Sequence, residues 1–220
     1  MIKALETPQR MSGEYRRAIT SQKSRTERKA DPVPTPFKRP FPAGFADSTF
    51  DGVNQSLRET LRETINTGPY PLFLYGGVGS GKTSAMALAH SCWPNHSYWY
   101  RLEEFVTDVT TCRQSKTKSV TKTYNGQPFD RTESMLWKFA ASPNLWCIDD
   151  FGTRTVSAAG FEIVFRLLNE RKDKPTIITS NLSPEQLAEL HDERIASRLR
   201  AGTVIEVTAP DRRKGRRLKV

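Results

Sequence analysis

Hydrophobic residues at helical spacing mark two amphipathic segments of this chain. The first stripe is formed by Val53, Leu57, Leu61 and Ile65, and the second by Phe161, Val164, Phe165 and Leu168. Gly68 and Pro69 end the first helix. Residues 183–186 read Ser-Pro-Glu-Gln, a capping-box pattern with proline at the first helical position, so we expect a further helix to begin there.

Five short apolar runs lie between the helical segments and predict β-strands. They cover residues 72–75, 98–100, 145–148, 176–179 and 204–207. Strands of this kind, alternating with helices, are typical of a parallel sheet that is buried on both faces. The hydrophobic pattern therefore predicts an α/β domain with a five-stranded parallel sheet, and we find no internal repeat.

Composition narrows the class of protein. No apolar run approaches the ~18 residues of a membrane span, and the N-terminus lacks the apolar stretch of a secretory signal. The three cysteines, Cys92, Cys112 and Cys147, include no C-x-x-C pair. We therefore expect a cytoplasmic protein with reduced thiols and no membrane partner, rather than a disulfide scaffold or a cysteine-based zinc module.

The net charge of +10 is concentrated at the two ends of the chain. Residues 1–40 carry +6, residues 208–220 carry +5, and the remainder carries −1. Five prolines between positions 32 and 42 favour extended backbone. We expect a flexible basic arm over 1–40 that docks a partner, a globular domain over 41–207 and a basic tail over 208–220. Nucleic acid is the leading anionic partner, which would make the protein nucleoid-associated, although tails that only add solubility would carry the same charge.

The strongest chemical signal is a phosphate-binding loop. GGVGSGKT satisfies G-x-x-x-x-G-K-[ST] and lies between a predicted strand and a helical run. The residues expected to surround the phosphates are Gly76, Gly77, Val78, Gly79, Ser80, Gly81, Lys82, Thr83 and Ser84. Lys82 should neutralise the β- and γ-phosphates, and the Thr83 hydroxyl should ligate Mg²⁺. ATP and Mg²⁺ are therefore the predicted cofactors.

Three further features complete a candidate ATPase site. Asp149 and Asp150 follow a buried strand, as in a Walker B motif, so Asp149 should hold Mg²⁺ through water and Asp150 should polarise the attacking water. Asn181 follows the next strand and could orient that water, although asparagine there is also a common turn former. Arg194 and Arg198 share a helix face, either as an arginine finger for a neighbouring subunit or as an ordinary solvated face.

These motifs together resemble a known family. GGVGSGKT, WCIDDFG, NERKDKPTIITSNLSPEQL and ERIASRLRAG are similar to the helicase-loader branch of the AAA+ ATPases, the DnaC/DnaI type, and to the IstB type of transposition ATPase. The resemblance covers roughly residues 44–207. It implies an AAA+ αβα sandwich in which Lys82, Thr83, Asp149, Asp150 and Asn181 have the roles given above. Arg198 best matches the trans-acting finger, with Arg194 as the alternate.

The two ends of the resembling region carry further expectations. PAGFADSTFDGV is similar to the family's entry segment, which packs near the adenine. About a dozen residues follow the last predicted strand, too few for the usual helical lid, so we expect no C-terminal lid domain. An Asp-Asp pair in place of Asp-Glu occurs in this branch and does not argue against ATPase activity.

A basic stretch in the middle of the chain is the candidate DNA contact. No acidic residue lies between Asp108 and Asp130. In this AAA+ branch the region resembles an extra helix or loop that lines the pore of the assembly and touches single-stranded DNA. The candidate DNA-binding residues are Arg113, Lys116, Lys118, Lys122 and Tyr124. The cations would contact phosphates and the tyrosine would stack on a base, unless this is a surface loop with incidental charge.

The leading functional interpretation is an ATP-dependent helicase loader or replication accessory protein. It would self-associate through ATP at subunit boundaries, bind single-stranded DNA and act on a hexameric replicative helicase. An IstB-type regulator with a transposase partner is the alternative, because the ATPase motifs do not separate the two. A nucleotide-binding scaffold without useful hydrolysis is the third possibility.

Overall fold

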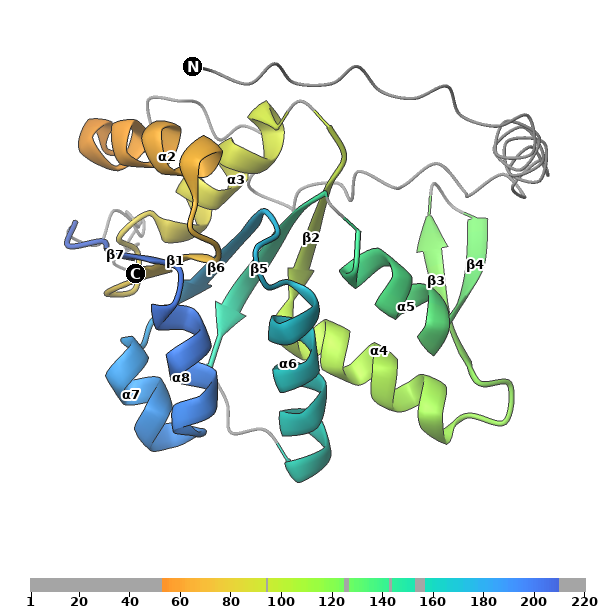
Figure 1. Cartoon of the computed structure of the whole chain (residues 1–220). Helices are drawn as coiled ribbons and strands as arrows, with labels where there is room; N and C mark the ends of the chain where they lie inside the picture. Colours follow the sequence, from red (N-terminus) through yellow and green to blue (C-terminus); the bar gives the residue numbers. More distant parts are fainter. Residues whose placement is uncertain (1–52, 94, 125–126, 143, 153–156, 210–220) are drawn as a thin grey trace, which may run out of the picture. The chain divides into compact units, whose positions relative to one another are not determined.

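A computed structural model describes residues 53–93, 95–124, 127–142, 144–152 and 157–209 (Figure 1). The arm expected over 1–40 and the basic tail beyond residue 209 lie outside these residues, as does the segment expected near the adenine up to residue 52. The three-part division of the chain therefore stays a prediction. Within the described residues, no helix is both long enough and apolar enough to cross a membrane.

The centre of the domain is a parallel sheet. Its five strands are β1 (Leu72–Tyr75), β2 (Ser97–Arg101), β5 (Leu145–Phe151), β6 (Thr176–Ser180) and β7 (Thr203–Glu206), in the order β2-β5-β6-β1-β7. Every apolar run predicted to be a strand is one, with β7 beginning one residue earlier than expected. Because β6 lies between β1 and β5, the strand tips after these three strands are neighbours at one edge of the sheet.

Helices cover both faces of the sheet. The helices are α2 (Gln55–Thr67), α3 (Lys82–Cys92), α4 (Leu102–Gln114), α5 (Glu133–Ala140), α6 (Ala158–Glu170), α7 (Pro184–Leu190) and α8 (Glu193–Arg200). Two separate hydrophobic clusters reflect the alternation along each strand. Leu72 and Leu74 of β1 pack with α2 and α3, whereas Phe73 packs with the helices on the other face. The αβα sandwich predicted from the strand pattern is confirmed.

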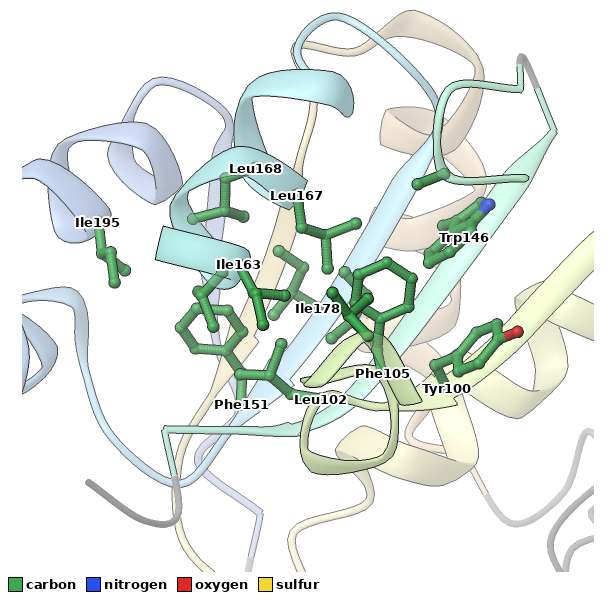
Figure 2. Packing of buried hydrophobic residues seen from close by; sticks show 14 of the residues in the cluster. Tyr100, Leu102, Phe105, Trp146, Phe151, Ile163, Leu167, Leu168, Ile178 and Ile195 are labelled. Atoms are coloured by element: carbon green, nitrogen blue, oxygen red, sulfur yellow. The ribbon is translucent and has the colours of Figure 1, made fainter. Parts of the chain in front are cut away.

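The larger cluster joins the sheet to α4 and α6. Figure 2 shows Trp146 and Ile178 of the sheet packed against Phe105 of α4 and Leu167 of α6. Trp146 is fully buried, and its ring lies 5.6 Å from that of Phe105 in an edge-to-face arrangement. Such contacts fix the position of β5, the strand that carries the paired carboxylates.

Local signals in the sequence explain several helix starts. Ser183 and Gln186 form the reciprocal hydrogen bonds of the predicted capping box at the start of α7. Ser157 accepts a hydrogen bond from the Gly160 N–H and caps α6. Asn54 does the same for α2 through the Ser56 N–H.

A β-hairpin occupies the region where an extra helix or loop was expected. Strands β3 (Ser119–Tyr124) and β4 (Gln127–Thr132) pair with each other antiparallel, apart from the main sheet. Three of the six residues in SVTKTY are β-branched, and the last is aromatic, which favours a strand over a helix. An ion pair of 2.6 Å between Lys122 and the buried Asp108 anchors the hairpin to α4.

A buried arginine connects α5, α6 and β6. Arg171 is 2% exposed. Its guanidinium group donates hydrogen bonds to the Thr176 hydroxyl and to the carbonyl oxygens of Ala140, Ser142, Asn144 and Pro175. Burial lowers the pKa of Arg171 to about 9, so the group remains protonated at neutral pH. It therefore satisfies carbonyl groups at the C-terminal end of α5 that the helix itself leaves unpaired.

Candidate nucleotide-binding site

The predicted phosphate-binding loop connects the end of β1 to the start of α3. Gly76 has a φ of +144°, and a Cβ at this position would lie 2.4 Å from the carbonyl oxygen of Val207. Only glycine fits such a close approach of two backbones. Gly81 is left-handed, with φ +99°, and immediately precedes α3. The loop thus turns from the sheet edge directly into a helix N-terminus, where backbone N–H groups favour an anion.

Lys82 is held against the backbone of this loop. The side chain is 7% exposed, and Nζ donates hydrogen bonds to the carbonyl oxygens of Gly76 at 2.9 Å and Gly77 at 2.8 Å. The positive charge is therefore fixed beside the N-terminus of α3. A charge at this point complements the phosphate oxygens that the loop N–H groups would bind.

A hydrogen-bonded triad joins the loop to two strand ends. The Thr83 hydroxyl donates to Asp149 Oδ1 at 3.1 Å, and the Thr179 hydroxyl donates to the same oxygen at 2.5 Å. Asp149 is 4% exposed. Burial raises the pKa of Asp149, and the charge of Asp150 adds to this effect, whereas the hydrogen bonds from Thr179 and Thr83 oppose it. A cation at this site would favour the ionised carboxylate.

Asp150 differs from Asp149 in conformation and exposure. The pairing of β5 with β6 is irregular between Ile148 and Phe151, and Asp150 has a φ of +57°. An L-residue adopts this left-handed conformation only at a cost of about 1–2 kcal/mol. The irregularity leaves Asp149 buried and Asp150 exposed at the sheet edge. Two adjacent carboxylates can therefore have different tasks.

Asn181 follows the end of β6, the strand next to the one that carries the two carboxylates. It directly follows Ser180, which is paired with Phe151 across β5 and β6. The Ser180 hydroxyl donates to the Phe151 carbonyl oxygen at 2.7 Å and accepts from the Leu182 N–H at 3.0 Å. These contacts fix the backbone on both sides of Asn181, whose side chain is exposed. Its predicted role toward the water near the γ-phosphate stays a prediction.

The oxygen groups around Asp149 fit magnesium. The Thr83 hydroxyl and the Asp149 carboxylate lie within hydrogen-bond distance, and oxygen is the ligand that Mg²⁺ prefers. In the part of the chain that the structure describes, no group of three or more His, Cys, Asp and Glu side chains is arranged to hold a metal. A magnesium ion here would therefore take most of its ligands from phosphate and water, as is usual for this metal.

The two candidate finger arginines lie on the surface formed by α6 and α8. Arg198 stacks on Phe165 at 4.0 Å and donates to Asn169 Oδ1 at 2.6 Å. Arg194 pairs with Asp192 at 3.0 Å. Arg198 lines a cavity together with Pro71 and Thr176, which lie at the N-terminal ends of β1 and β6. The phosphate-binding loop follows the opposite end of β1, so Arg198 does not face the nucleotide site of its own subunit.

The candidate DNA-binding residues are dispersed around the hairpin and mostly have partners within the chain. Arg113 forms a 2.7 Å ion pair with Glu133, and Lys118 donates to the Arg113 carbonyl oxygen at the end of α4. Lys122 is paired with Asp108. Lys116 is exposed, and the side chain of Tyr124 lies outside the described residues. The fold thus brings Asp108 of α4 and Glu133 of α5 next to the basic stretch, which contains no acidic residue itself.

Thr179 is absent from the residues that the sequence motifs predict for the site. The signal that could have revealed it is a hydroxyl group at the C-terminal end of the run Thr-Ile-Ile-Thr that follows Pro175, two residues before Asn181. Its importance depends on the pairing of β6 with β5, which brings residue 179 opposite the carboxylates. That pairing is a property of the folded sheet and not of the local sequence.

The chain has a relative of known function by sequence. No protein-family model matches the chain. A curated relative, the chromosomal replication initiator protein DnaA of Limosilactobacillus reuteri, is 32% identical over 144 residues, or 64% of this chain and 30% of that protein. The chain thus spans less than a third of the length of this relative.

Two solved structures show the same fold. The structure of DnaI has a TM-score of 0.58 and 19% identity, and the match covers 76% of this chain and 94% of DnaI. The replication initiator DnaA bound to AMPPCP and single-stranded DNA has a TM-score of 0.54 and 18% identity, over 69% of this chain and 44% of DnaA. The chain shares the αβα P-loop fold of these AAA+ proteins.

These matches agree with the expected AAA+ fold. They also add replication initiators to the types of protein that the chain resembles. The structural matches include the helicase-loader type that the motifs resemble. The sequence relatives reported above are replication initiators instead. Both types of protein use the same αβα arrangement, so the fold alone does not choose between them.

Proposed function

We propose that this chain is an ATP-dependent DNA replication accessory protein of the DnaC/DnaI helicase-loader type. The observation that carries the proposal is the hydrogen-bonded triad of Thr83, Asp149 and Thr179, which brings a phosphate-binding loop and a Walker B carboxylate together. The structural match to DnaI supports the loader type. DnaA, the relative by sequence, supports the link to replication.

The residues support ATP hydrolysis in the following way. Loop N–H groups and the Lys82 ammonium group would bind the phosphates, and Thr83 and Asp149 would hold Mg²⁺. The magnesium ion supplies charge stabilisation for the transferred phosphoryl group when it is bound. Asp150, exposed at the strand end, would accept a proton from the attacking water, and Asn181 would orient that water. Hydrolysis would be slow in a single subunit, since Arg198 reaches only a neighbour.

Binding of single-stranded DNA is a separate part of the proposal. The DnaA structure with single-stranded DNA supports it by similarity. Lys116 is exposed, whereas Arg113 and Lys122 are already paired with carboxylates. Phosphate contacts should make the affinity fall steeply as salt concentration rises.

Charge reversal tests the hairpin region as the DNA contact. We expect Lys116→Glu to weaken binding of a fluorescent single-stranded oligonucleotide several-fold and to reduce the salt dependence by about one counterion, because one phosphate contact is lost. ATP affinity should not change. Lys172→Glu, on the turn between α6 and β6, is the matched control. Equal DNA affinity of the two variants would assign DNA binding to another surface.

The partner is tested by ATP-dependent pull-down from the native host. The wild-type chain is compared with Lys82→Ala, which removes the ammonium group from the phosphate-binding loop. We expect the wild type to recover a hexameric replicative helicase in the presence of ATP, and the variant to recover little. Recovery of a transposase without helicase would reject the loader proposal in favour of the IstB-type alternative, with the ATPase assignment unaffected.

A further inference from the structure

We propose that Thr179 is a positioning residue that sets the orientation of both Asp149 and Asp150 in the nucleotide site. This inference rests on the proposed ATPase function. Thr179 lies in β6, between the strand that precedes the phosphate-binding loop and the strand that carries the carboxylates. It is therefore at the centre of the three strand ends that form the site.

The hydrogen bonds of Thr179 connect it to both aspartates. Its hydroxyl donates to Asp149 Oδ1 at 2.5 Å and accepts from the Asp150 N–H at 3.3 Å. Thr179 is 1% exposed, so its hydroxyl has little access to water. A hydroxyl group can donate one hydrogen bond and can also accept one. Thr179 uses the first capacity on Asp149 and the second on Asp150.

Strand register explains why one residue serves two carboxylates. Ile148 pairs with Ile178, and Phe151 pairs with Ser180. Asp149 and Asp150 together therefore face the single residue Thr179. An irregularity of this type, with two residues opposite one, turns the side chains next to it in new directions. The hydrogen bond from the Asp150 N–H holds this residue in its left-handed conformation, at φ +57°.

The orientation of Asp149 follows from two hydroxyl donors. Thr83 and Thr179 both bind Oδ1, one from α3 and the other from β6. Since a carboxylate is planar, fixing Oδ1 from two directions also fixes the direction of Oδ2. Residues that orient a metal ligand without touching the metal commonly affect metal affinity or activity by about 10–100-fold. Thr179 lies in such a position relative to Asp149. Valine would fill the same buried space in the strand equally well, but it has no hydroxyl group to orient the carboxylate.

The test compares variants that differ in the hydroxyl group alone. Thr179→Val keeps the branched shape and removes the hydroxyl, and Thr179→Ser keeps the hydroxyl and removes the methyl group. Thr176→Val is the matched control, because Thr176 is a buried threonine of the same strand that hydrogen-bonds Arg171 at the other end of the sheet. Binding of a fluorescent ATP analogue is measured over a range of Mg²⁺ concentrations, together with phosphate release and thermal unfolding.

We expect Thr179→Val to raise the Mg²⁺ concentration at half-maximal nucleotide binding about 10-fold and to lower kcat by about 10–100-fold. Nucleotide binding without Mg²⁺ should stay as in the wild type. Thr179→Ser should remain close to the wild type, whereas Thr176→Val should lower the unfolding temperature and leave the Mg²⁺ dependence unchanged. If Thr179→Val does not fold, Thr179→Cys replaces it, since a thiol fits the same space and is a weak donor.

Two outcomes separate the inference from the function on which it rests. A folded Thr179→Val with wild-type Mg²⁺ dependence and kcat would overturn the positioning role. Equal Mg²⁺ shifts in Thr179→Val and Thr176→Val would overturn it as well, because the effect would then be one of stability. If the wild-type chain itself neither binds the fluorescent ATP analogue nor releases phosphate, the proposed function fails instead.

Discussion

Replacing Arg198 with alanine is expected to leave ATP binding intact and to lower the hydrolysis rate of the assembled protein by about 10³-fold. An arginine finger supplied by a neighbour typically has an effect of this size or larger. Arg198 lies near the N-terminal ends of β1 and β6. The phosphate-binding loop begins after the other end of β1, about 13 Å further along the strand. The guanidinium group therefore lies away from the candidate nucleotide site of its own chain, and in the proposed assembly it would serve a neighbouring subunit.

Mixing of two inactive variants measures this arrangement directly. Arg198→Ala retains a nucleotide site and lacks the finger, whereas Lys82→Ala retains the finger and lacks a working site. Phosphate release should be partly restored when both variants are combined at concentrations that permit assembly. Arg200→Ala is the control, because Arg200 is an exposed arginine of the same helix that is ion-paired with Glu193. Unimpaired hydrolysis by Arg198→Ala alone would remove the trans-acting assignment.

The contacts of Arg198 within its own chain restrict the position of its side chain. Its guanidinium stacks on Phe165 and donates to Asn169, both on α6. A second neutral acceptor, the Arg194 carbonyl oxygen, lies at 3.0 Å. Stacking and two neutral acceptors restrict the long side chain without placing a carboxylate against its charge. In the proposed assembly, these contacts would keep the side chain close to its helix until a phosphate group of another subunit approaches.

Replacing Arg171 with methionine is expected to destabilise the domain by about 3–5 kcal/mol, a large effect for one substitution. The reason is that several buried carbonyl oxygens, among them those of Ala140 and Asn144, would lose their hydrogen-bond donor. At roughly 2–4 °C per kcal/mol for a domain of this size, the unfolding temperature should fall by about 6–20 °C. Thermal unfolding followed by circular dichroism measures this change.

An exposed arginine provides the comparison for Arg171. Arg166 lies on the solvent side of α6, where it stacks on Trp137 at 4.0 Å and has a side chain that is 48% exposed. Arg166→Met should cost about 1 kcal/mol or less, because no buried acceptor loses its partner. Similar losses of stability in the two variants would show that the buried carbonyl groups find other donors, such as water.

Much of the fold could be predicted because its signals are local. The strand before Gly76, the capping box at Ser183 and the carboxylates after Ile148 are each defined by a few adjacent residues. Spacing alone therefore located the five strands, which the structure confirms, and the predicted phosphate-binding loop, which lies between β1 and α3 as expected. The roles of Asp150, Asn181 and Arg198 stay predictions.

The remaining features depend on contacts between distant segments. Arg171 lies in the charged sequence NERKDK, which resembles a solvated turn until the carbonyl groups of α5 surround it. Lys122 lies in a basic stretch, and its partner Asp108 comes from the preceding helix. Thr179 acquires its importance only when β6 pairs with β5. Hydrophobic periodicity contains no information on such pairings.

The order of the strands also links nucleotide binding to folding. The triad connects residues that are 66 and 30 positions apart in the chain, and β6 must be inserted between β1 and β5 before Thr83, Asp149 and Thr179 can meet. A partly folded chain therefore lacks the site, and a nucleotide would bind the native state alone. At a concentration one hundred times its dissociation constant, such a ligand adds about 2.7 kcal/mol to the stability of the native state. The cellular ATP level would then help to determine how much of the protein is folded and protected from proteolysis.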